Sequence, residues 1–191
     1  MSKKQEIISI ATEIIHSKGY QPTSISDILD ASNIGKGQFY HYFASKYDLG
    51  LAVVEYIIQN MTNPLITNTL QSKDDPKSKI NKMLDWVIAY HSGMQEKLGC
   101  PIGNLAIEMS EHDETFRSKI QHFLTRWIEA IDNSLAEMIE QNQLNSNVDT
   151  RKSAEAIASM VQGGILLMKN QKDIQILKNV VDMIRLQFNL S

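Results

Sequence analysis

The feature that most constrains this 191-residue chain is the spacing of its apolar residues, which recur every three or four positions along most of its length. Residues 7–15 show it clearly, because Ile7, Ile10, Ala11, Ile14 and Ile15 fall on one face of a helix. Valine and isoleucine never alternate with polar residues for long, and no Asn-Gly or Asp-Gly pair marks a hairpin turn. The sequence therefore predicts an all-α fold.

Start and stop signals divide this pattern into about nine helices. Ser24 with Asp27, and Ser45 with Asp48, have the spacing of a helix-capping serine and an acidic residue in the first turn. Pro76 and Pro101 suit the first turn of a helix. We expect helices before the glycine at 19, over 25–32 and 36–43, from 46 onward, from 76 to about 97, from 101, and over about 114–143, 150–169 and 173–188.

Composition limits the class of protein. A chain with 42% apolar residues can bury a sizeable core, yet no run approaches the roughly 18 apolar residues of a membrane span, and the first residues lack a signal-peptide core. The single cysteine, Cys100, fits a reducing compartment, so we expect a cytoplasmic protein with no membrane partner. The net charge of −3 excludes a bulk basic field, and any nucleic-acid site must therefore be local.

The helices predicted near residues 25–43 have the organisation of a helix-turn-helix. Two short helices are separated by a tight turn near 32–35, and the second one can enter a DNA major groove. Phe39 and Phe43 are four positions apart, so they share a face that we expect in the core, whereas Gln38 points away and its amide can read a base edge. Ser24 and Ser26 begin the preceding helix, where the N-terminal dipole favours a phosphate; Ser24 also suits a cap.

The run TSISDILDASNIGKGQFYHYFASKYDL (23–49) resembles the TetR/AcrR transcriptional regulators. It has their Thr/Ser cap, turn, glycine, aromatic segment and the following Lys and Leu. The resemblance implies an N-terminal helix-turn-helix domain over 1–46 and a C-terminal helical effector-binding and dimerisation domain over 47–191. Glycine lets the backbone approach DNA, and lysines neutralise phosphates. Together with the chemistry above, the resemblance implies DNA contacts at Ser24, Ser26, Lys36, Gly37, Gln38, Tyr40, His41, Tyr42 and Lys46.

The resemblance also implies a mechanism: a homodimer binds a pseudo-palindromic operator in double-stranded DNA, most commonly as a repressor, until a small-molecule effector releases it. Members of the family dimerise by pairing their last two helices in a four-helix bundle, and this chain carries apolar stripes there. Ordinary intramolecular core is the alternative for some of them. The predicted interface residues are Ile157, Met160, Val161, Gly164, Ile174, Leu177, Val181, Ile184 and Phe188.

The middle helices gather large or flexible apolar side chains, with a few polar ones, where the family has a ligand cavity; plain core is the alternative. The predicted pocket comprises Trp86, Tyr90, Met94, Cys100, Asn104, Met109, Phe116, Trp127, Gln162 and Lys169. Cys100 directly precedes the predicted start of a helix at Pro101, where a helix dipole lowers the pKa of a thiol. Modification of Cys100 is therefore a second route of release, against the alternative of a small buried hydrophobe.

Enzyme and metal sites find little support. The chain has no Gly-rich phosphate loop, no G-x-S-x-G and no H-E-x-x-H, and Glu108 with His112 lacks a second histidine at ligand spacing. We expect no catalytic residue, no metal and no cofactor. The rival hypothesis is an all-helical small-molecule-binding protein or enzyme without a DNA-binding role.

Overall fold

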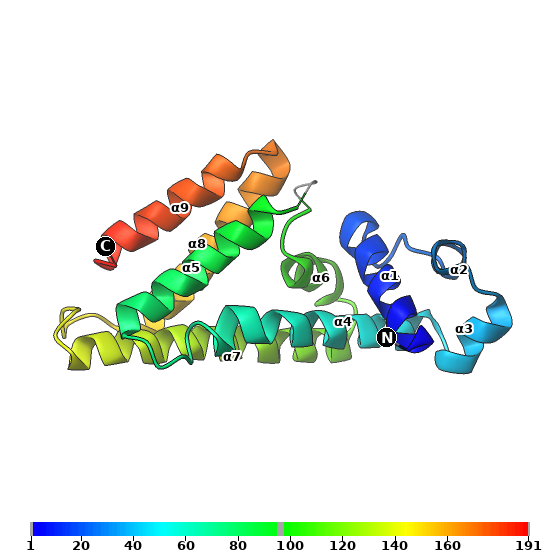
Figure 1. Ribbon diagram of the computed structural model, residues 1–191, viewed down its shortest axis with the longest axis horizontal. Helices are drawn as coiled ribbons and strands as arrows, with labels where there is room; N and C mark the ends of the chain where they lie inside the picture. Colours follow the sequence, from blue (N-terminus) through cyan, green and yellow to red (C-terminus); the bar gives the residue numbers. More distant parts are fainter. Residues whose placement is uncertain (1, 95–97, 191) are drawn as a thin grey trace. The chain divides into compact units, whose positions relative to one another are not determined.

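The computed structural model describes residues 2–94 and 98–190, and within them every regular element is a helix (Figure 1). The prediction of an all-α fold with about nine helices is confirmed. The elements are α1 (Lys3–Lys18), α2 (Ile25–Ser32), α3 (Lys36–Tyr42), α4 (Lys46–Thr62), η1 (Asn63–Thr67), α5 (Pro76–Ser92), α6 (Pro101–Met109), α7 (Glu114–Glu140), α8 (Thr150–Gln171) and α9 (Ile174–Gln187). None of the helices in these ranges is long and apolar enough to cross a membrane.

Local signals explain most helix starts. Ser24 and Asp27 form the predicted capping box of α2, and Pro76 and Pro101 are the first residues of α5 and α6. The predicted end of the fifth helix near residue 97 lies outside the described residues, and α5 ends at Ser92. Phe43 is extended, so α3 stops one residue earlier than expected.

A π-helical segment, η1, was not predicted. It follows α4 directly and contains Pro64 in its first turn. Proline has no N–H and its ring crowds the carbonyl four residues earlier, so α4 cannot continue its regular hydrogen bonds through this position. The Asn68 N–H instead donates to the Asn63 carbonyl at 2.8 Å, five residues back.

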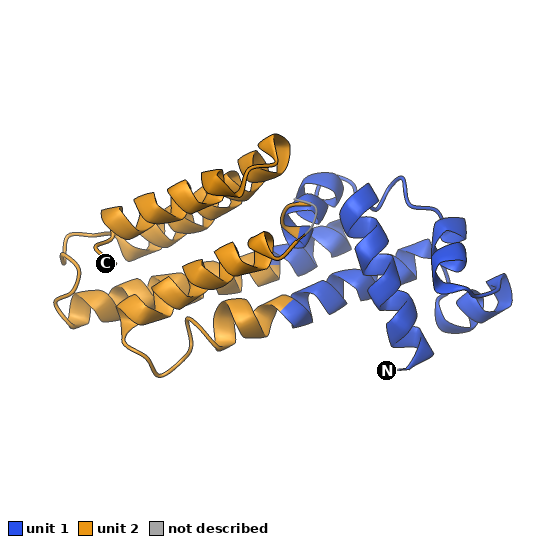
Figure 2. Cartoon of the chain, turned by 45° about the horizontal axis from the view of Figure 1, so that its top comes forward, with its two compact units in different colours: residues 1–60, 101–121 blue, residues 61–100, 122–191 orange. Residues whose placement is uncertain are grey.

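The chain forms two compact units, coloured separately in Figure 2. Unit 1 comprises residues 1–60 and 101–121, so α6 and the start of α7 belong with the N-terminal helices; unit 2 comprises residues 61–100 and 122–191. The predicted boundary between a DNA-binding domain (1–46) and an effector-binding and dimerisation domain (47–191) divides the chain by function, whereas the two units divide it by packing. That boundary therefore stays a prediction. In unit 1 Phe39 and Phe43 are at most 1% exposed, with ring centroids 5.7 Å apart, which confirms their place in the core.

Most of the predicted dimer-interface residues are part of the core of unit 2. Helices α8 and α9 pack closely along each other, and a Cβ on Gly164 would lie 3.2 Å from Leu177 and 3.3 Å from Val180. Seven of the predicted interface residues are buried within the single chain, so they offer no surface to a partner: Ile157, Val161, Gly164, Leu177, Val181, Ile184 and Phe188. Met160 and Ile174 are half-buried. The alternative interpretation, intramolecular core, therefore describes this stripe.

Candidate nucleic-acid interface

The helix α3 separates buried from exposed side chains as its spacing predicts. It follows a turn in which Asn33 adopts a left-handed conformation (φ 49°, ψ 52°) and caps α2 with its backbone N–H. Phe39 is fully buried, which fixes one face of α3 against the rest of unit 1. The predicted DNA-contacting residues of this helix lie on the other side: Lys36, Gly37, Gln38, Tyr40 and His41 are exposed, and Tyr42 is half-buried.

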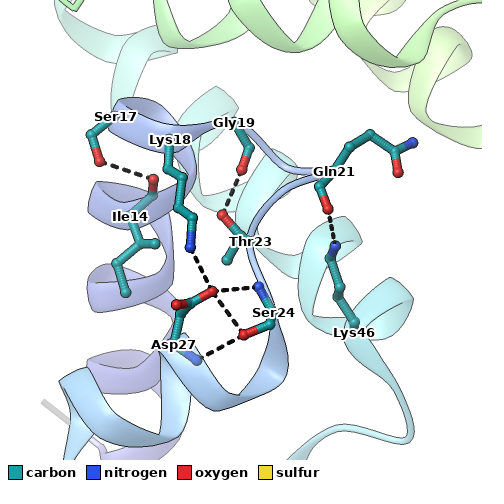
Figure 3. A network of polar contacts seen from close by, with 9 residues as sticks. All are labelled: Ile14, Ser17, Lys18, Gly19, Gln21, Thr23, Ser24, Asp27 and Lys46. Carbon is teal, nitrogen blue, oxygen red and sulfur yellow. Dashed lines mark hydrogen bonds and ion pairs between the residues drawn. The ribbon is translucent and has the colours of Figure 1, made fainter.

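The start of α2 is held by a polar network drawn in Figure 3. One oxygen of the Asp27 carboxylate accepts hydrogen bonds from the Ser24 N–H at 2.6 Å, the Ser24 hydroxyl at 2.8 Å and the Lys18 ammonium at 2.8 Å. The hydrogen bond from Lys18, followed by those from Ser24, holds the pKa of Asp27 far below its usual range. Ser24 therefore acts as a cap, while Ser26 is exposed beside it.

Lys46, the first residue of α4, points toward the turn between α1 and α2. Its ammonium donates to the Gln21 carbonyl at 2.9 Å and lies 4.6 Å from the centroid of the Tyr20 ring. Burial lowers the pKa of Lys46. An ammonium has three N–H donors, so this internal hydrogen bond and a phosphate contact are compatible.

A cation that sequence reasoning missed lies near the end of α3. The Lys4 ammonium is 5.3 Å from the centroid of the Phe43 ring. Such a contact is a cation–π interaction, and it places a positive charge next to the residue that ends α3. No local motif could have revealed it, because Lys4 and Phe43 are far apart in the sequence and meet only through the packing of unit 1.

The predicted pocket residues divide between the two units. In unit 2, Trp86 and Tyr90 stack with ring centroids 5.0 Å apart, and the Gln162 amide donates to the Cys100 sulfur at 3.6 Å. Burial, and then the neighbouring Cys100, raise the pKa of Tyr90. Tyr90, Cys100 and Gln162 thus form one cluster, which we call the Cys100 cluster, and Cys100 itself is 5% exposed.

Three other unit 2 residues of the predicted pocket differ in burial. Trp127 is 2% exposed, and its indole Nε1–H has no hydrogen-bond partner among residues 2–94 and 98–190. Met94 is half-buried, whereas Lys169 is exposed on α8 and so lies away from the core of its unit.

The remaining pocket residues belong to unit 1. The Met109 sulfur accepts from the Gln21 side-chain amide at 3.6 Å, and the Phe116 ring lies 5.2 Å from Tyr20 and 5.9 Å from Tyr47. Asn104 is half-buried on α6. Met109 and Phe116 are therefore core residues beneath the turn between α1 and α2, as the alternative interpretation allows.

Comparison with known proteins identifies the class to which this arrangement belongs. A family model described as "Bacterial regulatory proteins, tetR family" matches residues 7–53, and one described as "Transcriptional regulator LmrA/YxaF-like, C-terminal domain" matches residues 76–183. The chain is 33% identical over 189 residues to an HTH-type transcriptional regulator in the lacX 3′ region of Lactococcus lactis subsp. lactis, covering 97% of this chain and 92% of that protein.

Two further proteins are similar over most of their length. The HTH-type transcriptional repressor DhaR of a Mycobacterium species (strain GP1) is 22% identical over 170 residues, which is 89% of this chain and 84% of the relative. The crystal structure of a TetR transcriptional regulator from Chloroflexus aurantiacus superposes with a TM-score of 0.85 at 23% identity, covering 95% of this chain and 91% of that one. The chain therefore belongs to the TetR family of DNA-binding transcriptional regulators, with a C-terminal domain of the LmrA/YxaF-like type.

Proposed function

We propose that the chain is a homodimeric repressor that reads a pseudo-palindromic operator with α3 and leaves it when a small molecule binds. The observation that carries this proposal is the exposed polar face of α3, with Gln38 outward and Phe39 fully buried behind it. Gln38 supplies the base readout, since its amide offers a donor and an acceptor. Ser24, Ser26, Lys36, Gly37, Tyr40, His41, Tyr42 and Lys46 contact the DNA backbone around it.

Whether the chain represses or activates transcription is inferred from a relative whose name states its role. By its name, DhaR is a transcriptional repressor. We therefore favour repression.

Dimerisation uses the exposed faces of α8 and α9 in place of the buried stripe. Seven large apolar side chains are exposed among the described residues, and four of them lie on these two helices: Leu166, Leu167, Met183 and Leu186. Leu186 is 71% exposed. Exposed apolar side chains on two helices that pack against each other mark an interaction surface, and a second copy of the chain covers it.

The effector binds in unit 2 near the Cys100 cluster. Trp127 supports a ligand with a hydrogen-bond acceptor, because its buried indole N–H has no partner within the described chain. Between the two routes of release we favour ligand binding over modification of Cys100. A thiol that is 5% exposed meets electrophiles and oxidants slowly, whatever its acidity.

Footprinting on DNA that flanks the gene tests the proposal. We expect the wild-type chain to protect a pseudo-palindromic site, and Gln38→Ala to protect it less while still binding unrelated DNA as wild type does. An all-helical protein without a DNA-binding role would protect no site and would show no salt-dependent DNA affinity.

A further inference from the structure

The turn between α1 and α2 is held by a carboxylate from α6. The Glu108 Oε2 atom accepts from the Tyr20 N–H at 2.9 Å, and its Oε1 atom accepts from the Gln21 N–H at 2.6 Å. These residues are 88 and 87 positions apart in the sequence, and all of them belong to unit 1. One side chain thus satisfies two successive backbone donors just after the end of a helix.

Other groups fix the same turn. Gly19 adopts a φ of +96°, and a Cβ there would lie 3.4 Å from both Glu108 oxygens, so the glycine lets the carboxylate approach. On the far side of the peptide, Lys46 donates to the Gln21 carbonyl at 2.9 Å. The Gln21 side chain reaches the sulfur of Met109, the residue after Glu108. Side chains of both α6 and α4 therefore hydrogen-bond to this turn.

The position of the turn governs the proposed DNA contacts. Residues 19–23 lead directly into Ser24 and Ser26, which begin α2, and the Gln21 carbonyl sets where the Lys46 ammonium lies. Hydrogen bonds to a carboxylate are about twice as strong as neutral ones, and Glu108 accepts two of them, so it restrains this turn strongly.

We propose that Glu108 is a positioning residue for DNA binding: its carboxylate fixes the α1–α2 turn in the conformation that presents Ser24, Ser26 and Lys46 to the operator. This inference rests on the proposed function.

The test compares Glu108→Gln with Glu111→Gln in the full-length chain. Glu111 is exposed in the turn after α6, so its substitution removes the same charge without touching the α1–α2 turn. In Glu108→Gln the new amide group faces one backbone N–H, and one of the two hydrogen bonds is lost. We expect hydrogen exchange at the Tyr20 and Gln21 amides to accelerate at least about tenfold, and operator affinity to fall about three- to tenfold, relative to Glu111→Gln.

Two readouts separate this inference from the proposed function. Equal amide exchange in Glu108→Gln and Glu111→Gln would overturn the positioning role, and so would equal operator affinity when wild type binds DNA. If wild type itself protects no operator, the proposed function fails, while the exchange comparison still decides whether Glu108 holds the turn. If Glu108→Gln does not fold, Glu108→Asp replaces it in both measurements. Aspartate keeps the charge, but its side chain is one methylene shorter, so its carboxylate cannot reach both amides.

Discussion

Replacing Gly50 by alanine should destabilise the protein, although the same change stabilises most helices. Gly50 lies inside α4 and has the rings of Tyr20 and Phe116 against its backbone. A Cβ there would lie 2.5 Å from Cε2 of Tyr20 and 3.0 Å from Cζ of Phe116. Carbon atoms prefer about 3.5–4.0 Å, so a ring must move by about 1 Å.

The magnitude follows from two opposing effects. The Tyr20 ring cannot move freely, because it is 7% exposed and lies between Phe116, 5.2 Å away, and the Lys46 ammonium, 4.6 Å away. Overpacking of this kind costs about 1–3 kcal/mol, and we expect the upper half of that range because the displaced ring also loses both neighbours. Alanine gains about 1 kcal/mol over glycine in a helix interior. The net loss should be about 1–2 kcal/mol.

Urea unfolding at one fixed protein concentration measures this effect. The matched control is Gly37→Ala in α3, where a Cβ would meet nothing within 4 Å. The control should be neutral or stabilising by up to about 1 kcal/mol. A Gly50→Ala protein as stable as wild type would show that the packing of Tyr20 on α4 is not as described.

Three further predictions concern DNA binding, assembly and pH. Gly37→Ala should weaken operator binding in a mobility-shift assay while leaving stability intact, because the added methyl group separates α3 from DNA; unchanged affinity would remove Gly37 from the interface. Leu186→Lys should shift the chain to monomers in analytical ultracentrifugation, whereas Ile107→Lys, which replaces another exposed apolar residue, should not; a dimeric Leu186→Lys protein would place the interface elsewhere. The pKa of Asp27 is lower in the folded protein than the unfolded value of about 3.9, so the ionised carboxylate stabilises the fold above about pH 4. This stabilisation is lost as the pH falls further. The urea midpoint of wild type should therefore drop between pH 6 and pH 3, and that of Asp27→Asn should drop less.

Local signals predicted most helices because each depends on neighbouring residues. The Ser24–Asp27 capping box and the prolines at 76 and 101 determine helix starts through contacts within one turn. The split of α3 into buried Phe39 and exposed Gln38 likewise follows from helical spacing alone. The missed π-helical segment around Pro64 shows the limit, since a proline announces a break but not the hydrogen bonds that replace it.

Long-range packing explains what the sequence could not supply. The spacing of Val161 and Leu177 shows that they are buried, but not whether the same chain or a partner covers them; here the same chain does. Glu108 presented the clearest case. The sequence raised Glu108 only as a rejected metal ligand beside His112, whereas its carboxylate binds two backbone amides nearly ninety residues away. Only the fold brings these groups together.

A salt-titrated affinity comparison tests most directly whether α3 reads a specific DNA site. Wild type, Gln38→Ala and Lys36→Ala are each measured on the protected flanking sequence and on unrelated DNA. We predict that Gln38→Ala loses affinity only for the protected sequence, whereas Lys36→Ala weakens both and reduces the salt slope by about one. If wild type bound both DNAs equally, or if neither substitution changed its affinity, α3 would not be the reading helix.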